Sequence, residues 1–218
     1  MTTDFRAYLR SLPVFAGELP RFDPDAAPDK PDDLFREWLV EAVEAGVREP
    51  HAMTLSTTAS DGAPAARVLI VKNVDEHGWQ FAAHDTSPKG RDLTAHRAAA
   101  LTFYWPARAR QVRVRGPVVP EPPERSAADF LARPPGSRAE ASIGRQSQVL
   151  HDPADLDRAI KLARDRLDDQ PSLVVPEWTL HTLRPAEVEF WQGDAGRRHT
   201  RLRYTRPNST WQRDILWP

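Results

Sequence analysis

The sequence predicts an α+β fold in which an antiparallel β-barrel carries helices on its outside. Five strand-like runs follow one another with short links between residues 53 and 119. Short links suit antiparallel neighbours, because parallel strands need long crossover connections. Apolar residues recur at helical spacing before these runs and in stretches after them, and further strand-like runs close the chain. A closed barrel is the simplest arrangement of such strands, since it leaves no exposed strand edge.

Length and composition limit the class of protein. The 218 residues fit a single domain, which we place over residues 32–218, after an N-terminal arm over residues 1–31. Cysteine is absent, which excludes disulfides, thiolate metal sites and cysteine nucleophiles and is compatible with a reducing cytosol. The net charge of -1 gives no overall field for nucleic acid, and no apolar run has the length of a signal peptide or a membrane span. We therefore expect a cytoplasmic protein without nucleic-acid or membrane partners.

The first half begins with irregular sequence and continues with a helix and strands. Pro and Asp without periodicity in residues 1–31 predict an arm that lies over the body or is partly disordered. Asp32 and Asp33 suit the cap of a helix near residues 33–48, and Ser60-Asp61-Gly62 suits a turn between strands. The predicted strands are 53–58, 66–74, 79–84, 98–105 and 110–119, with a short helix over 87–96.

The second half is predicted to place helices before the last strands. Helical spacing marks residues 124–133 and 154–168, with a polar loop over 136–151 between them. Strands are predicted at 178–183, 188–192, 200–206 and 211–216.

Two cationic segments of the first half are candidates for holding an anion. Arg67 and Lys72 end one strand-like run, and their spacing puts them on opposite faces of a regular strand. Ser87 suits a helix N-cap and Pro88 the first turn, so that free backbone N–H groups and Lys89 would form a phosphate cradle. The alternatives are a buried strand with solvated cationic ends and an ordinary capped surface helix.

Two polar segments add directional hydrogen-bonding groups. Strict alternation in residues 110–116 points Val112 and Val114 inward and leaves Gln111 on the other face, where its amide can meet the edge of a heteroaromatic ring. Gln146 and Ser147 supply donors and acceptors from a polar loop. Taken alone, neither segment specifies a ligand.

A row of cations follows a tryptophan near the C-terminus. If residues 197–204 are extended, Arg197, His199 and Arg201 share one face, just after the strand that carries Trp191. Such a row suits a planar, anionic, aromatic ligand, because guanidinium groups bind oxygen anions and indole covers ring surface. The alternative is a cationic strand that faces solvent.

Motifs of several other enzyme classes are missing. The sequence has no H-E-x-x-H, no G-x-G-x-x-G and no nucleophile elbow, and the other histidines are scattered singly. We therefore expect no metal site.

In this order and spacing, seven short motifs over residues 34–218 resemble the pyridoxamine 5'-phosphate oxidase family of FMN-dependent split-barrel flavoproteins. They are Arg67–Lys72, Ser87-Pro88-Lys89, Arg110-Gln111-Val112, Arg133-Pro134 with Ser137, Arg145-Gln146-Ser147, Glu189-Phe190-Trp191 with Gly193, and Arg197-x-His199-x-Arg201. The resemblance implies a split barrel, bound FMN and a homodimer with active sites at the subunit interface.

The resemblance also implies roles for individual residues. Arg67, Ser87 and Lys89 would hold the FMN phosphate and ribityl chain, and the residues around the isoalloxazine would be Gln111, Gln146 with Ser147, Trp191 and Arg201. Lys72, Arg133 and Ser137 match ligands of the substrate phosphate. Arg197 and His199 match the catalytic groups over the substrate ring.

Some positions depart from the family pattern. Asp129 stands where the family has a tyrosine at the substrate phosphate, and Pro88 replaces an arginine of the cradle. Asp129 and Arg133 are four residues apart in a predicted helix, so we expect them to pair, or Asp129 to repel a substrate phosphate. The arm and Gly46–Pro50 resemble the dihydrophenazine oxidases of phenazine biosynthesis.

Three functions follow from these observations. The first is an FMN-dependent oxidase that converts pyridoxamine or pyridoxine 5'-phosphate to pyridoxal 5'-phosphate and reduces dioxygen to hydrogen peroxide. The second is an FMN-dependent oxidase of a phenazine-like intermediate in secondary metabolism. The third is a flavin-binding protein without turnover.

Overall fold

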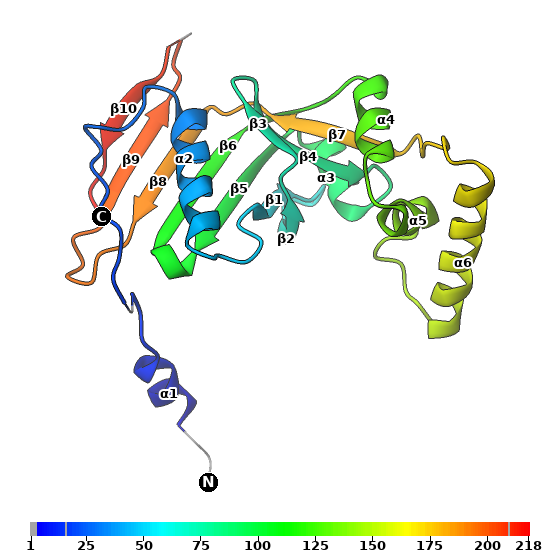
Figure 1. Cartoon of the computed structure of the whole chain (residues 1–218), viewed down its shortest axis with the longest axis horizontal. Helices are drawn as coiled ribbons and strands as arrows, with labels where there is room; N and C mark the ends of the chain where they lie inside the picture. Colours follow the sequence, from blue (N-terminus) through cyan, green and yellow to red (C-terminus); the bar gives the residue numbers. More distant parts are fainter. Residues whose placement is uncertain (1–3, 16, 209) are drawn as a thin grey trace. The chain divides into compact units, whose positions relative to one another are not determined.

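The computed structural model of the chain describes residues 4–15, 17–208 and 210–218, and Figure 1 shows its elements. Residues 1–3 and 16 of the predicted arm lie outside the described residues. The α-helices are α1 (Phe5–Ser11), α2 (Pro31–Glu44), α3 (Pro88–Ala95), α4 (Pro123–Leu131), α5 (Pro135–Ile143) and α6 (Pro153–Asp169). The strands are β1 (Ala52–Thr58), β2 (Pro64–Ile70), β3 (Asn73–Asp75), β4 (Gly78–His84), β5 (Ala98–Trp105), β6 (Arg110–Pro120), β7 (Trp178–Leu183), β8 (Glu187–Gln192), β9 (Thr200–Thr205) and β10 (Gln212–Ile215).

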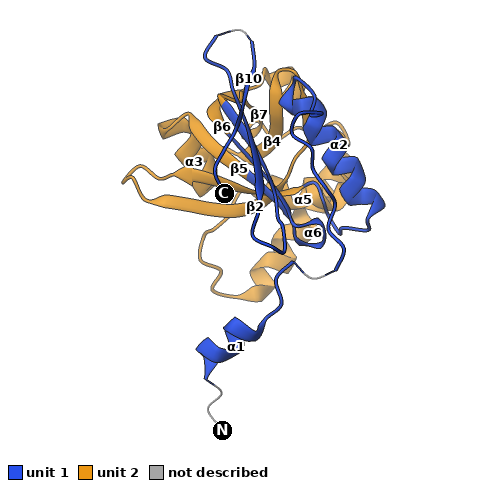
Figure 2. Cartoon of the chain, turned by 90° about the vertical axis from the view of Figure 1, so that its left-hand side faces the viewer, with its two compact units in different colours: residues 1–51, 102–114, 187–218 blue, residues 52–101, 115–186 orange. Residues whose placement is uncertain are grey.

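The chain forms two units, each assembled from separate stretches of sequence (Figure 2). Unit 1 comprises Met1–His51, Thr102–Val114 and Glu187–Pro218, and unit 2 comprises Ala52–Leu101 and Arg115–Ala186. Strands β5 and β6 each run from one unit into the other. Because two strands are shared between the units, we propose that residues 32–218 form a single domain.

Unit 1 packs α2 against an antiparallel set of strands. Its strands follow the order β10-β9-β8-β6-β5. Phe35 and Trp38 of α2 are buried, and their rings lie 4.7 Å from Phe103 and 5.1 Å from Phe190 between centroids. Buried Arg110 lies over the Trp38 ring at 4.2 Å and donates to Glu41 at 2.7 Å, which ties the helix to β6.

Unit 2 holds the cationic segments on two sets of antiparallel strands. β1 pairs with β2 through a turn in which Ala59 N–H donates to the Ala63 carbonyl at 2.8 Å. β4 pairs with β3 and β7, and the end of β6 pairs with β7. Helix α4 lies against β7, with the Phe130 and Trp178 rings 6.0 Å apart, and α5 packs on α6 through Ala139, Ala163 and Leu167.

The structure confirms the α+β class with antiparallel strands, but it corrects several elements. The barrel is not closed: among the described strands, β10 pairs only with β9 and β2 only with β1, so both have a free edge. The predicted strand over 66–74 is two strands, β2 and β3. The predicted loop over 136–151 contains α5, because Pro135 starts a helix whose Ala139 packs on α6.

The N-terminal region also differs from the prediction. The arm contains helix α1, which has no buried residue and stands apart from the sheet of its unit (Figure 2). Helix α2 begins at Pro31, so Asp32 and Asp33 lie in its first turn and do not cap it. None of the helices in the described ranges is both long enough and apolar enough to span a membrane.

Candidate functional site

A buried lysine at the start of α3 is the centre of a cationic cluster in unit 2. Ser87 is the N-cap predicted from the sequence, and its hydroxyl accepts the Gly90 N–H at 3.2 Å. Lys89 is only 7% exposed, and its ammonium donates to Ser87 Oγ at 3.3 Å and to Gln146 Oε1. Burial lowers the pKa of Lys89, and the positive charge of Arg67 lowers this pKa further. This cation would therefore gain from an anion bound beside it.

The guanidinium group of Arg67 is positioned by two residues that the sequence did not identify, Thr57 and Asp92. Its Nη1 donates to Thr57 Oγ1 at 2.6 Å, and its Nη2 lies 3.6 Å from Asp92 Oδ2. The Thr57 hydroxyl in turn donates to Asp92 at 2.7 Å. Thr57 and Asp92 are both buried, so they fix the position of the guanidinium group before any ligand binds. Lys72 lies beyond the end of β2, so the two cations do not share one regular strand as predicted, and Lys72 pairs with Asp129 instead.

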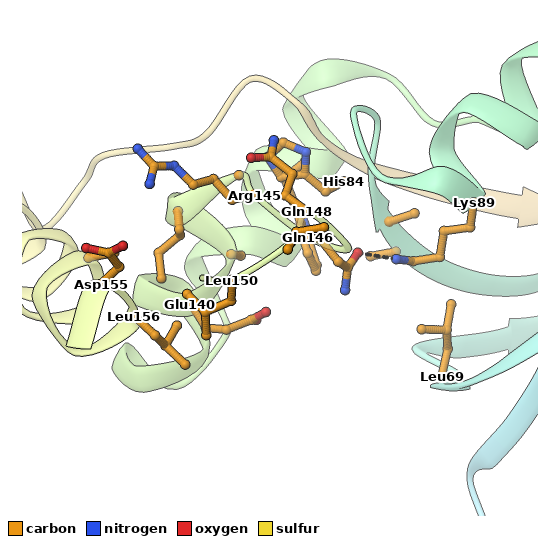
Figure 3. Close-up of a pocket in the computed structure, with 18 of the residues that line it drawn as sticks. Leu69, His84, Lys89, Glu140, Arg145, Gln146, Gln148, Leu150, Asp155 and Leu156 are labelled. Atoms are coloured by element: carbon orange, nitrogen blue, oxygen red, sulfur yellow. Dashed lines mark hydrogen bonds between the residues drawn. The ribbon is translucent and has the colours of Figure 1, made fainter. Parts of the chain in front are cut away.

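Unit 2 contains a cavity of about 510 Å³ beside this cluster. Figure 3 shows Lys89 reaching from α3 toward Gln146, with His84 drawn beside Gln148. Arg133, Glu140 and Trp178 also line the cavity. A cavity of this size, with apolar walls and a few converging polar groups, can hold part of a cofactor or a small aromatic ligand.

Two lining residues of this cavity, Arg133 and Trp178, pack against each other, and Trp178 is hydrogen-bonded to a carboxylate. The Arg133 guanidinium lies 3.9 Å from the centroid of the Trp178 ring, and Trp178 Nε1 donates to Asp129 Oδ2 at 2.8 Å. Asp129 Oδ1 lies 3.5 Å from Lys72 Nζ. Asp129 and Arg133 do not form the predicted direct ion pair, because α4 ends at Leu131, before Arg133, but the negative charge of Asp129 still acts to raise the pKa of Arg133. Burial lowers the pKa of Arg133, and Arg133 Nη1 is buried without a hydrogen-bond partner among the described residues.

In unit 1, His199 lies beside Trp191, as the sequence suggested, but it does so from a turn and not from an extended strand. β9 starts at Thr200, so Arg197 and His199 belong to the β8–β9 turn, and Arg197 has a left-handed φ of 64°. The extended row of three alternating residues is therefore wrong. The His199 and Trp191 rings lie 5.1 Å apart, and His199 Nδ1 accepts the Asp194 N–H at 3.1 Å. A neutral His199 must then carry its proton on Nε2, where it can donate to a ligand.

A phenylalanine of the arm covers this group. The Phe15 ring lies 5.8 Å from Trp191 and 5.5 Å from His199, and the Arg197 guanidinium lies 5.8 Å from its centroid. A Cβ on Gly193 would lie 2.9 Å from Phe15 Cε1, so glycine allows this close contact. The sequence identified neither Phe15 nor Asp194, because irregular segments show no periodicity.

Arg201 is tied to a buried glutamate. Its Nε donates to Glu189 Oε1 at 2.9 Å and its Nη1 to the Trp217 carbonyl at 2.9 Å, while Glu189 also accepts from Arg113. Burial alone would raise the pKa of Glu189, but the hydrogen bonds from Arg201 and Arg113 outweigh it, and this pKa is lowered. The charge of Arg201 is thus partly neutralised within the chain.

The remaining predicted residues lie on the surfaces of their elements. Gln111 is half-buried on β6, opposite the buried Val112 and Val114, as the alternation predicts. Ser137 is half-buried in α5, and Ser147 is exposed with a φ of 69°. In the described part of the chain, no three His, Cys, Asp or Glu side chains are grouped as metal ligands.

Comparison with known families gives two matches along the chain. The model described as pyridoxamine 5'-phosphate oxidase matches residues 39–166. The model described as the pyridoxine 5'-phosphate oxidase C-terminal dimerisation region matches residues 178–218.

Named relatives match over most of their length. The pyridoxine/pyridoxamine 5'-phosphate oxidase of Pseudomonas fluorescens is 42% identical over 194 residues, which cover 88% of this chain and 90% of the relative. The enzyme of the same name from Burkholderia multivorans is 45% identical over 182 residues, 84% of each chain.

Two solved structures share the fold. PhzG from Burkholderia lata, in complex with tetrahydrophenazine-1-carboxylic acid, superposes with a TM-score of 0.84 and 31% identity over 93% of this chain and 100% of that one. A pyridoxamine 5'-phosphate oxidase-related FMN-binding protein from Nostoc punctiforme superposes with a TM-score of 0.70 and 17% identity over 88% of this chain and 100% of that one. The split barrel of the FMN-binding type is thereby confirmed.

Proposed function

Because the chain belongs to the pyridoxamine 5'-phosphate oxidase family, whose members are FMN-dependent oxidoreductases, we propose that it oxidises pyridoxamine or pyridoxine 5'-phosphate to pyridoxal 5'-phosphate. Bound FMN would supply the acceptor for the substrate's hydride, and its reoxidation by dioxygen would give hydrogen peroxide. A cytoplasmic role in pyridoxal 5'-phosphate formation is part of this proposal.

The buried Lys89 is the observation that carries the proposal. Lys89, Ser87 and Arg67 offer a doubly charged phosphate two cations and a hydroxyl, and the lowered pKa of Lys89 means that an anion beside it is favourable. These residues therefore fit the FMN phosphate, and Gln146, which accepts from Lys89, would adjoin it.

Residues of unit 1 supply the remaining functions in this proposal. Trp191 offers a ring surface, His199 Nε2 a hydrogen-bond donor and Arg197 a cation, all on or beside one turn. Their role is to orient the substrate ring and to stabilise the charge that develops on it. Gln111 and Arg201 of unit 1 would contact the flavin ring, and Arg133, Lys72 and Ser137 of unit 2 would bind the anionic group of the substrate. The dimerisation region at residues 178–218 supports a homodimer.

A second substrate class is favoured by one specific observation. PhzG, bound to tetrahydrophenazine-1-carboxylic acid, matches 93% of this chain with a TM-score of 0.84. The chain would then oxidise a larger aromatic carboxylate.

Anaerobic reduction of the bound flavin tests both candidates. FMN-loaded protein is mixed with pyridoxamine 5'-phosphate, flavin bleaching is followed, and air is then admitted while pyridoxal 5'-phosphate and peroxide are measured. Rapid bleaching with equal amounts of aldehyde and peroxide is expected. A parallel sample is mixed with a dihydrophenazine carboxylate. If only this compound bleaches the flavin, the chain belongs to the second substrate class. If neither compound bleaches the flavin, the protein binds flavin without turnover.

A further inference from the structure

We propose that Asp194 is a positioning residue, whose side chain holds the β8–β9 turn of unit 1 in the shape that places Arg197 and His199 beside Trp191. The inference rests on the proposed function, because it concerns the turn that would orient the substrate ring. It deepens that function by assigning the shape of the turn to one carboxylate within it.

The β8–β9 turn is too long to take its shape from the strands that it joins. The last pair of the ladder is Gln192 with Thr200, so residues 193–199 lie outside the ladder. A two-residue hairpin loop is shaped by the twist of its strands, whereas a longer loop needs hydrogen bonds of its own.

Asp194 takes part in three hydrogen bonds inside this turn. Its N–H donates to His199 Nδ1 at 3.1 Å, and its carbonyl accepts the Arg197 N–H at 3.0 Å. Its carboxylate oxygen Oδ1 accepts the Arg198 N–H at 3.1 Å. The first two bonds use backbone atoms that other residues also have, so only the third depends on the aspartate side chain.

The side-chain bond closes the turn around a residue in an unfavourable conformation. Arg197 has a φ of 64°, which a non-glycine residue seldom adopts because its Cβ crowds the backbone. Such a conformation persists where the surroundings fix it. The Arg197 N–H is bound to the Asp194 carbonyl, and the N–H of the next residue is bound to the Asp194 carboxylate. Asp194 therefore holds the peptide groups on both sides of Arg197.

Little else in unit 1 fixes this part of the turn. Arg197 and Arg198 are exposed, so packing against the strands contributes little to their position. Without the carboxylate, the turn should sample other shapes, and Arg197 and His199 should leave their places for part of the time. A misplacement of about 1 Å can cost a reaction about 100-fold in rate, so even partial loosening should be measurable.

Two substitutions at Asp194 separate its hydrogen bond from its charge. Asp194→Ala removes the acceptor, whereas Asp194→Asn keeps an oxygen that can accept the Arg198 N–H. When pyridoxamine 5'-phosphate reduces the FMN-loaded protein anaerobically, Asp194→Ala should lower the rate per bound FMN about tenfold, and Asp194→Asn should stay within about twofold of the parent. The FMN content should be the same in all three proteins. A parent-like rate in Asp194→Ala, or an equal loss in Asp194→Asn, would overturn the proposal.

Backbone order parameters from NMR relaxation measure the turn without any substrate. In the parent, the amides of Arg197 and Arg198 should have values near the ~0.85 of rigid backbone, and in Asp194→Ala these values should fall toward about 0.6. Asp194→Asn should keep the parent values. If the order parameters are the same in Asp194→Ala and the parent, the carboxylate does not shape the turn and the proposal is wrong.

Asp61→Ala is the matched control. Asp61 Oδ1 also accepts a backbone N–H in a turn between two strands, that of Ala63 at 3.0 Å, but this turn joins β1 to β2 in unit 2. The reduction rate should change less than twofold, and the order parameters at Arg197 and Arg198 should not change. Losses like those of Asp194→Ala would show a general effect on stability and would contradict the proposal.

These measurements distinguish a failure of the inference from a failure of the proposed function. If no candidate substrate reduces the parent, the proposed function is lost, and the order parameters still decide whether Asp194 shapes the turn. If pyridoxamine 5'-phosphate reduces the parent and Asp194→Ala equally fast, the proposed function stands and the inference is lost.

Discussion

At the scale of single residues, the structure separates groups that share a charge but differ in what surrounds them. Lys89 is buried beside Ser87 and Gln146, whereas Arg91, two residues later in the same helix, is exposed and donates to the Thr86 carbonyl. Burial lowers the pKa of Lys89. Desolvation thus distinguishes a cation suited to binding an anion from one whose charge is solvated and screened by water.

Lys89→Met is expected to weaken FMN binding. The substitution keeps most of the apolar stem but removes a charge-assisted hydrogen bond, worth about 1.5–3 kcal/mol, so the affinity should fall about tenfold or more. Fluorescence titration of the apoprotein with FMN measures the change. Arg91→Met serves as the control and should change the affinity less than twofold; equal effects of the two variants would contradict the assignment.

His181 should make the folded state sensitive to acid. It is buried in β7, its two ring nitrogens have no hydrogen-bond partner among the described residues, and burial lowers its pKa below 6.5. The unfolded chain therefore takes up a proton first as the pH falls below about 6.5. The free energy of unfolding then decreases until the pH reaches the folded pKa, below which this contribution is constant.

His181→Phe should flatten this part of the pH dependence. The new ring can stack on Phe81, as His181 does at 5.6 Å, and it cannot titrate. Urea unfolding between pH 5 and 8 measures the slope. The exposed His77→Gln should keep the parent slope, and a parent slope in His181→Phe would show that another group causes it.

At the scale of elements, the start of α3 is positioned by a close contact between backbones. A Cβ on Gly90 would lie 2.4 Å from the His84 carbonyl oxygen and 2.5 Å from that of Asp85. Glycine therefore allows α3 to approach the end of β4 closely, which places Lys89 beside the cavity. The packing of this helix and the geometry of the cationic cluster therefore both depend on the absence of a Cβ at Gly90.

Gly90→Ala should therefore destabilise unit 2 and weaken FMN binding together. Overlap with backbone atoms cannot be relieved by a side-chain rotation, so we expect a loss of about 1–3 kcal/mol in the free energy of unfolding. Gly136→Ala is the control, because nothing lies within 4 Å of its Cβ in the first turn of α5, and it should stabilise slightly. Chemical denaturation and FMN titration check both variants, and a neutral Gly90→Ala would refute the close approach.

At the scale of the whole molecule, two strongly exposed apolar side chains lie in the region that matches the dimerisation model. Trp217 is 92% exposed and Ile215 is 63% exposed, both within residues 178–218. Large apolar groups in such a region suit an interface with a second copy of the chain. In a two-fold symmetric interface, each of these residues is buried once in each subunit.

Trp217→Asp is expected to weaken self-association. Loss of a buried indole costs roughly 1.5–3 kcal/mol per copy, so the dimer dissociation constant should rise about 100-fold or more. Sedimentation velocity over a range of concentrations measures it. Leu162→Asp, on α6 outside the matched region and 69% exposed, should leave the dimer unchanged; a similar loss in both would point to a general solubility effect.

The sequence by itself determined the class of fold and most elements. Period-2 and period-3.6 patterns, the turn at Gly62 and the N-cap at Ser87 are local signals, so they needed no knowledge of distant contacts. The order and spacing of short motifs also identified the family and its FMN cofactor. The features that were missed, α1, α5 and the break between β2 and β3, lie where local patterns are short.

Only the tertiary structure decided the partners of the charged residues. Asp129 has Lys72 and Trp178 as partners, 57 and 49 positions away in the sequence, although its helical spacing favoured Arg133. Glu189 joins Arg113 to Arg201, and Phe15 of the arm reaches Trp191 and His199. Such contacts depend on strand register and on where each helix ends. Local periodicity carries no information about either, because it reports only which face of an element is buried.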